Sequence, residues 1–217
     1  MRLKLALFDL DGTLKQVRDP YIYLHQQLGT WEDAQAFFPL GLEGKIPYAE
    51  WLRRDVALWA GQPVGRIIAL FRANPYLPGA RETLQALKRA RVTVALISTG
   101  LTLHAELVRV ECGLDYAFAN EALVADGHLT GEAVERVPEG SKGLIADRLM
   151  AELGVSSEEL LAVGDGRSDI ALFERAGVSV AVNPSSDEVR AAADIVLEEP
   201  DLRPLLSLLK AWYPELE

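Results

Sequence analysis

Short apolar runs recur along the chain, and each is followed by a stretch with helical periodicity. The runs predict buried strands at 3–8, 92–97, 160–163, 178–182 and 195–197. The helices predicted between them lie at 80–90, 103–111, 141–153, 169–176 and 187–192. This alternation predicts an α/β fold with a doubly wound, Rossmann-like and mostly parallel sheet.

Two segments depart from the alternation. Within 122–134, the pair Asp126-Gly127 separates two short runs, which predicts a β-hairpin. Segment 15–78 has no convincing strand and holds several helical stretches punctuated by Pro and Gly. We therefore expect a small all-helical cap over 15–78, inserted after the first strand. The α/β core domain is expected over 1–14 and 79–217.

Composition limits the classes of function. A chain of 217 residues with 49% hydrophobic and 25% charged residues is typical of a globular protein. Its net charge of −10 disfavours a broad basic face for nucleic acid or an anionic membrane. The single cysteine, Cys112, cannot form an internal disulfide, and no apolar run is long enough for a signal peptide or a membrane span. We expect a cytoplasmic protein without nucleic-acid or membrane partners.

Two aspartates one residue apart close the first predicted strand, in Asp9-Leu10-Asp11-Gly12-Thr13. Open α/β sheets bind ligands at the carboxyl ends of their strands. Carboxylates at close range repel, so a pair at this edge points to a metal ion, a shared proton or both. The alternative is an Asp-Gly turn with Asp9 merely solvated.

Two further segments point to an anion. Ser98-Thr99-Gly100 ends the second long strand before a helix, where hydroxyls and free amides bind phosphate well. An ordinary Ser/Thr N-cap is the alternative there. Lys142 stands at the start of another predicted helix, where a cation opposes the helix dipole. An anion nearby would explain that position, and a solvated lysine is again the alternative.

The last cluster is acidic. Asp165 ends a predicted strand between Gly164 and Gly166, and Asp169 follows in the first turn of a helix. Acidic residues are common at helix starts, so Asp169 alone is unremarkable. Asp165 is the stronger candidate for a hard-cation ligand together with Asp9.

In this order, the clusters resemble the motifs of the haloacid dehalogenase superfamily of phosphatases over nearly the whole chain. The segment from Asp9 to Thr13 is similar to its first motif, Ser98 to its second, Lys142 to its third, and Asp165 with Asp169 to its fourth. The helical insertion, with Gly44-Lys45-Ile46-Pro47-Tyr48, resembles the cap of the phosphoserine-phosphatase branch. The C-terminal stretch from Asn183-Pro184 to Arg203 is similar to that branch as well.

The resemblance implies a Mg²⁺-dependent hydrolase of a small-molecule phosphomonoester. Asp9 would attack phosphorus to give an aspartyl-phosphate, and Asp11 would act as general acid and base. Mg²⁺ would be held by Asp9, the backbone carbonyl of Asp11 and Asp165, with Asp169 behind them through water or Lys142. The residues expected to bind phosphate are Gly12, Thr13, Ser98, Thr99, Gly100 and Lys142.

Specificity residues depart from that branch, whose members hold the substrate's amine with a cap glutamate and its carboxylate with a cap arginine. Ungapped counting from Asp9 puts Arg18 at the glutamate position, and aligning the cap helix puts Asp55 at the arginine position. Asp55 lies in the apolar stripe of that helix. We expect it to pair with Arg18 or Arg54, or to bind a substrate hydroxyl or amine. Ser168 stands where the branch usually has Asn.

Other functions stay open at this stage. A genuine phosphoserine phosphatase, a phosphotransferase and a non-catalytic phosphate-binding regulatory protein are alternatives to a hydrolase of another phosphometabolite. The acid and base needed for hydrolysis also serve phosphotransfer, so the sequence does not separate them. It leaves monomer or homodimer undetermined. The histidines His25, His104 and His128 are scattered and predict no metal site.

Overall fold

A computed structural model describes residues 2–214, so the first residue and the last three of the predicted core domain lie outside the described part. Within it, seven strands form one sheet in the order β4-β3-β2-β1-β5-β6-β7. β4 is antiparallel to β3, and all other neighbours are parallel. The predicted α/β fold class and hairpin are confirmed. The strands are β1 (Leu5–Phe8), β2 (Thr93–Leu101), β3 (Tyr116–Ala125), β4 (His128–Val134), β5 (Leu160–Gly164), β6 (Val178–Val182) and β7 (Ile195–Leu197).

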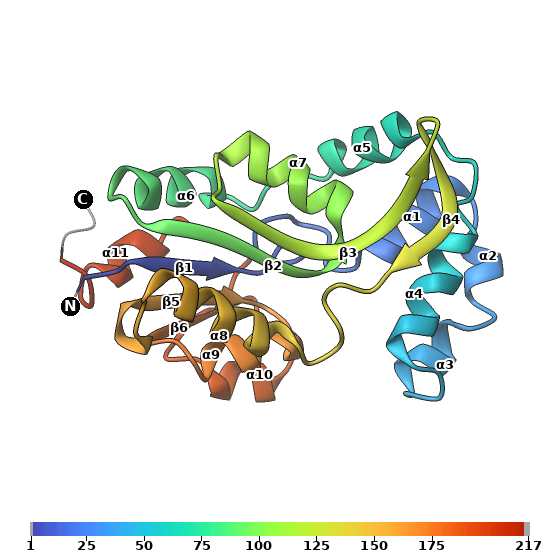
Figure 1. Cartoon of the computed structure of the whole chain (residues 1–217). Coiled ribbons are helices and arrows are strands. Elements are labelled where there is room, and N and C mark those ends of the chain that lie inside the picture. The colour runs from blue at the N-terminus through green and yellow to red at the C-terminus, as the bar shows by residue number, and fades with distance from the viewer. Residues whose placement is uncertain (1, 215–217) are drawn as a thin grey trace.

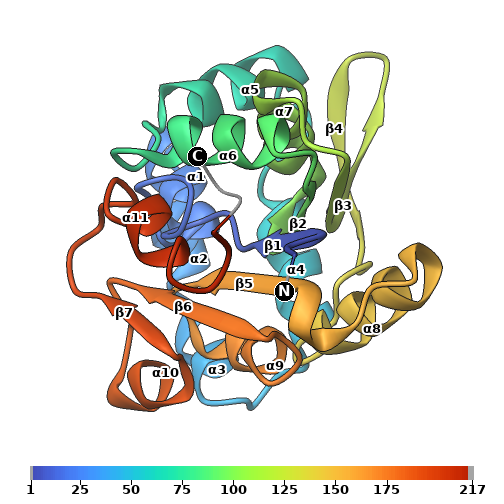
Figure 2. The ribbon, with the colours of Figure 1, turned by 90° about the vertical axis from the view of Figure 1, so that its left-hand side faces the viewer.

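Helices cover both faces of the sheet (Figures 1 and 2). In β1, Ala6 and Phe8 pack into one apolar cluster while Leu5 and Leu7 pack into the other, as the alternation of side chains along a strand requires. The first cluster is closed by α6 (Ala80–Arg89), α7 (Thr102–Cys112) and α11 (Leu205–Leu209). The second is closed by α8 (Lys142–Leu153), α9 (Ile170–Phe173) and α10 (Asp187–Ala192). Short 3-10 helices are η1 (Ser157–Glu159) and η2 (Arg167–Asp169).

The chain between β1 and α6 is helical and packs against the hairpin that β3 and β4 extend beyond the sheet (Figure 1). Its helices are α1 (Pro20–Leu28), α2 (Trp31–Ala34), α3 (Phe38–Leu42), α4 (Tyr48–Ala57) and α5 (Val64–Ala73). A third apolar cluster joins Leu24, Val56 and Trp59 of this segment to Leu101 and Leu129 of the sheet. The domain boundaries proposed from the sequence stay a prediction, since side chains from both predicted domains build this cluster.

The second strand is longer than predicted. Pairing between β2 and β3 shifts register after Ile97 and resumes at Leu101 opposite Asn120. Ser98, Thr99 and Gly100 therefore lie on the strand, and the helix α7 begins at Thr102, one residue before its predicted start. β1 lies between β2 and β5, so the ends of these three strands share one edge of the sheet. Within residues 2–214, no helix is both long enough and apolar enough to cross a membrane.

The two-sided burial of β1 can be tested with Phe8, which is fully buried. We expect Phe8→Ala to lower the free energy of unfolding by about 3–5 kcal/mol, because it removes buried apolar surface and leaves a cavity. Urea denaturation measures this change. Val124→Ala, on the hairpin at 46% exposure, is the control and should cost less than about 0.5 kcal/mol. Equal costs for the two variants would contradict the burial of β1.

Candidate active site

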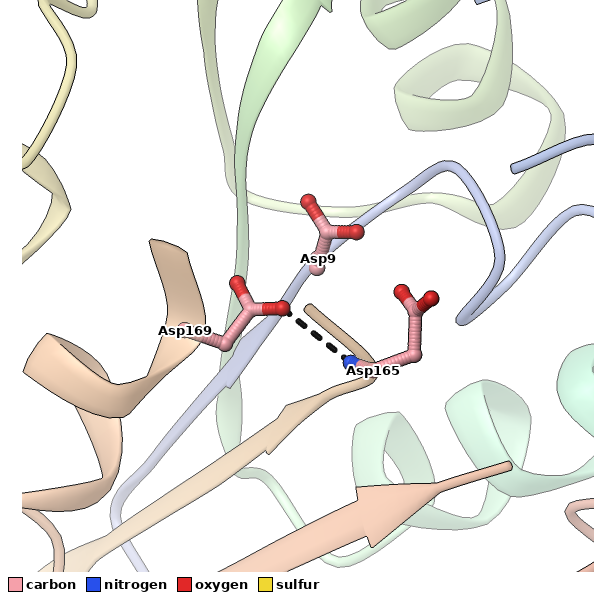
Figure 3. A group of neighbouring side chains, drawn as sticks. All are labelled: Asp9, Asp165 and Asp169. Carbon is pink, nitrogen blue, oxygen red and sulfur yellow. Dashed lines mark hydrogen bonds between the residues drawn. The ribbon is translucent and has the colours of Figure 1, made fainter. Parts of the chain in front are cut away.

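Three buried aspartates meet at the carboxyl edge of the sheet (Figure 3). Asp9 follows β1, Asp165 follows β5, and Asp169 is the last residue of η2. Each offers a carboxylate oxygen, and these oxygens all lie within 4.8 Å of one another. Hard cations such as Mg²⁺ take carboxylate oxygens as ligands, and buried carboxylates at this spacing repel without a positive charge. The donor set therefore fits a divalent cation.

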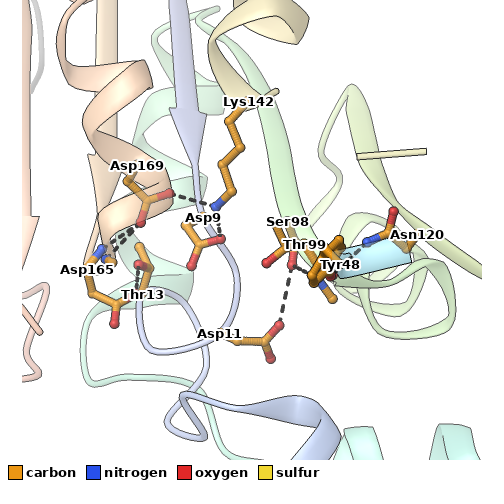
Figure 4. A network of polar contacts seen from close by, with 12 residues as sticks. Asp9, Asp11, Thr13, Tyr48, Ser98, Thr99, Asn120, Lys142, Asp165 and Asp169 are labelled. Carbon is orange, nitrogen blue, oxygen red and sulfur yellow. Dashed lines mark hydrogen bonds and ion pairs between the residues drawn. The ribbon is translucent and has the colours of Figure 1, made fainter. Parts of the chain in front are cut away.

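The ammonium group of Lys142 supplies part of the positive charge that these carboxylates need. Lys142 Nζ donates to Asp9 Oδ1 and to Asp169 Oδ1, both at 2.6 Å (Figure 4). Burial acts to lower the pKa of Lys142, but the carboxylates of Asp169 and Asp9 outweigh it and raise this pKa above its ordinary value. Lys142 begins α8, and two carboxylates offset the unfavourable helix dipole there. Because the Lys142 side chain is buried, the alternative of a solvated lysine is wrong.

The carboxylate of Asp165 is held by its neighbours. Thr13 Oγ1 donates to Asp165 Oδ1 at 2.9 Å. Gly12 has φ of +87°, and a Cβ there would lie 2.5 Å from Asp165 Oδ2. Gly12 and Thr13, which are predicted to bind phosphate, therefore both lie against Asp165, and their binding of phosphate stays a prediction. Asp169 Oδ2 accepts from the amides of Asp165 and Gly166 at 3.1 and 2.9 Å.

Asp11 faces the end of β2 and the first turn of α7. Its Oδ2 lies 3.4 Å from the Ser98 hydroxyl, and a Cβ on Gly100 would lie 2.8 Å from the same oxygen. Its Oδ1 lies 3.1 Å from Nδ1 of the fully buried His104, whose ring stacks on Phe71. Sequence reasoning missed this neighbour of Asp11, because an isolated histidine on an amphipathic helix carries no pattern of its own.

A second missed group holds the Thr99 carbonyl oxygen. It accepts hydrogen bonds from the Tyr48 hydroxyl at 2.7 Å and from Asn120 Nδ2 at 2.8 Å (Figure 4). The Tyr21 hydroxyl donates to the same oxygen at 2.9 Å. Asn120 Oδ1 also accepts from the amides of Arg136 and Val137. α1, α4 and β3 thus converge on one peptide of the site.

Two adjoining hollows open over these residues, and their walls share Arg18, Pro20 and Thr99. The catalytic hollow has a volume of about 230 Å³ and is also lined by Asp9, Asp11, Ser98, Gly100, Asp165, Gly166, Ser168, Asp169 and Ser185. The cap hollow has a volume of about 170 Å³ and is also lined by Asp19, Tyr21, Tyr48, Trp51, Leu52 and Asp55.

The ion pairs expected for Asp55 do not form. Arg18 Nε lies 3.5 Å from Asp165 Oδ2, and its guanidinium also donates to the Asn183 carbonyl. Arg54 pairs with Glu50 one turn earlier on α4 and lines neither hollow, because neighbouring residues such as Arg54 and Asp55 diverge on a helix.

The partner of Asp55 is His25, whose Nε2 lies 3.0 Å from Asp55 Oδ1. This pair was not predicted, because the two residues lie 30 positions apart on different helices. Ser168 lines the catalytic hollow.

Fold and site together define an α/β protein with a buried acidic cluster that fits a cation at one edge of its sheet. The model of haloacid dehalogenase-like hydrolases matches residues 6–174, so the chain belongs to that family. A phosphoserine phosphatase of Methanocaldococcus jannaschii is 33% identical over 208 residues, covering 95% of this chain and 98% of that protein. One of Wolinella succinogenes is 34% identical, covering 95% of this chain and 100% of that protein.

Solved structures of phosphoserine phosphatases are also similar to this chain. The substrate-bound complex of a phosphoserine phosphatase has a TM-score of 0.82 to this chain at 32% identity, covering 96% of this chain and 99% of its own. The phospho-aspartyl intermediate analogue of a phosphoserine phosphatase has a TM-score of 0.81, with the same identity and coverages. The family resemblance is confirmed, while the roles of individual residues stay predictions.

The packing of Asp169 gives a test of site geometry. A Cβ on Gly164 would lie 2.4 Å from Cβ and Cγ of Asp169, so Gly164→Ala must displace that side chain. We expect it to lower the free energy of unfolding by about 1–3 kcal/mol. Gly166→Ala is the matched control, since its Cβ would lie no closer than 3.6 Å to Asp169. Thermal unfolding of both variants measures the difference, and equal stabilities would contradict this packing.

Cation binding should depend on pH. Burial and the neighbouring Asp169 raise the pKa of Asp165 from 3.8 to about 7. Without a cation, stability from its protonation is therefore present below pH 3.8 and lost as the pH rises through about 7. A cation competes with that proton, so stabilisation by Mg²⁺ should grow from about pH 6 to about pH 8. Thermal unfolding with and without Mg²⁺ measures this; an unchanged Mg²⁺ shift in Asp165→Asn would refute it.

Proposed function

We propose that the chain is a Mg²⁺-dependent phosphomonoester hydrolase acting through an aspartyl-phosphate on Asp9. The observation that carries this proposal is the placement of Asp9 between Lys142 and the catalytic hollow, with Asp11 lining the same hollow. The proposed nucleophile Asp9, the buried ammonium of Lys142 and the carboxyl group of Asp11 thus share one edge of the sheet. The small volume of the two hollows suits a small-molecule substrate.

In the first step, an Asp9 oxygen forms a bond to phosphorus while the bond to the ester oxygen breaks. An aspartate is ionised at neutral pH in water, but burial raises the pKa of Asp9 well above its ordinary value, and Lys142 offsets only part of that rise. Mg²⁺ held by Asp9, the Asp11 backbone carbonyl and Asp165 would supply charge that offsets repulsion between carboxylate and phosphate. Asp11 donates its proton to the leaving alkoxide.

In the second step, Asp11 takes a proton from a water molecule whose oxygen attacks phosphorus. The bond to Asp9 breaks, and inorganic phosphate leaves. The Ser98 hydroxyl, the Thr99 amide and the Lys142 ammonium would bind phosphate oxygens in both steps, whereas the Gly100 amide already donates to Ser98 Oγ at 2.8 Å. Asp169 holds Lys142 in position through its 2.6 Å hydrogen bond.

A genuine phosphoserine phosphatase is the second candidate, favoured by the names of the relatives. Against it, the cap hollow presents Asp19 and Asp55, and its one cation, Arg18, contacts Asp165. Rates on L-phosphoserine and on a panel of sugar and polyol phosphates decide between the two. A strong preference for L-phosphoserine would favour this candidate.

Transfer to an acceptor other than water, and phosphate binding without turnover, are the remaining alternatives. Added glycerol should leave the ratio of free phosphate to released alcohol at one if water is the acceptor. Turnover itself separates an enzyme from a regulatory phosphate-binding protein.

Substitutions at the two aspartates test the division of roles. Asp9→Asn should abolish hydrolysis of p-nitrophenyl phosphate, because the amide is a poor nucleophile. Asp11→Asn should give a burst of about one p-nitrophenolate per enzyme and then turnover slowed by about 10²–10⁴-fold. The reason is that this leaving group departs without a proton, whereas water still needs a base. Stopped-flow absorbance measures both phases; a burst in Asp9→Asn, or full turnover in it, would refute the assignment.

A further inference from the structure

The cap hollow contains a carboxylate with no counter-charge. The Asp55 side chain is only 4% exposed, although the residue lines this hollow. Its Oδ1 lies 3.0 Å from His25 Nε2, while Oδ2 makes no hydrogen bond within residues 2–214. Burying an ionised carboxylate is costly unless a positive charge pairs with it. The state of His25 therefore decides whether the cap itself neutralises Asp55.

The hydrogen bonds of His25 make its ring neutral. Trp59 Nε1 lies 3.1 Å from His25 Nδ1, and an indole N–H can only donate. His25 Nδ1 must therefore accept, and the Thr30 hydroxyl at 2.7 Å can donate to the same atom. The one ring proton is then on Nε2, from which it is donated to Asp55 Oδ1. Asp55 receives a hydrogen bond but no positive charge.

The other walls of the cap hollow add negative charge and aromatic rings. Asp19 lines it, with Oδ1 accepting from the amides of Tyr21 and Ile22 at 2.9 Å as the N-cap of α1. Arg18, the single basic residue of the lining, is directed at Asp165 and the Asn183 carbonyl. Aromatic rings in the lining are those of Tyr21, Tyr48 and Trp51. Carboxylates together with aromatic faces favour an ammonium group.

We propose that the cap hollow binds the ammonium group of an O-phosphorylated amino alcohol that has no carboxylate. This inference rests on the proposed phosphohydrolase activity. The phosphate would lie in the catalytic hollow and the ammonium beside Asp55, on either side of the shared wall of Arg18, Pro20 and Thr99. The volume of about 170 Å³ restricts the alcohol to a short chain. A carboxylate on the substrate would be repelled by Asp19 and Asp55.

Three substrates of similar size test the charge requirement. O-phosphoethanolamine carries the ammonium, ethylene glycol monophosphate replaces it with a hydroxyl, and L-phosphoserine adds a carboxylate. We expect kcat/KM of the wild-type enzyme with Mg²⁺ to be at least about tenfold higher for phosphoethanolamine than for either of the others. A preference for the glycol ester would show that Asp55 binds a hydroxyl. A preference for phosphoserine would show that the site accepts a substrate carboxylate. Either result overturns the proposal.

Variants of α4 assign the preference to Asp55. Asp55→Asn keeps the shape and the acceptor for His25 but removes the charge, so the ratio of phosphoethanolamine to glycol ester should fall at least about tenfold. Glu50→Gln is the matched control: it removes one negative charge from the same helix outside both hollows and should keep the ratio. An unchanged ratio in Asp55→Asn would overturn the proposal.

The two proposals fail in distinguishable ways. Absence of Mg²⁺-dependent p-nitrophenyl phosphate hydrolysis by the wild type would refute the hydrolase and, with it, this inference. Hydrolysis of that ester without preference for phosphoethanolamine would refute the substrate class alone. Thermal unfolding shows whether Asp55→Asn is folded; if it is not, the wild-type comparison decides by itself.

Discussion

The contact on which the site depends is the ammonium of Lys142 held between Asp9 and Asp169 at 2.6 Å. Without a positive charge, the buried carboxylates at the ends of β1, β5 and η2 would repel one another. Lys142 offsets part of that repulsion and fixes the orientation of Asp9 toward the catalytic hollow. Residual negative charge remains, which is what makes the site suitable for a divalent cation. The same buried lysine thus serves stability and the proposed chemistry.

The peptide of Thr99 joins this charged edge to the cap. Its carbonyl receives donors from α1, α4 and β3, so the helices over the site are held in register with the strand that carries Ser98. The shared wall of the two hollows contains this residue. In the proposed function, a substrate would have its phosphate on one side of this backbone segment and its alcohol portion on the other.

Much of the catalytic edge could be predicted, because each candidate follows a buried strand or begins a helix, and parallel strands end at a common edge. Asp9, Asp165, Asp169 and Lys142 are brought together as that rule requires. The contacts of the cap residues were harder to predict from the sequence. Whether Asp55 meets Arg18, Arg54 or His25 depends on helix orientations that no local pattern fixes, and the continuation of β2 to Leu101 depends on its pairing with β3.

The sequence by itself determined the α/β class, the hairpin and the family, since hydrophobic periodicity and ordered motifs are local properties of a chain. Only the tertiary structure decided the partners of the buried polar groups. Gly12 and Thr13 support Asp165, His104 lies beside Asp11, and Asp55 meets His25 instead of Arg18 or Arg54. The physical reason is that a buried group must satisfy its hydrogen bonds and charge with whatever the fold brings within reach, however distant in sequence.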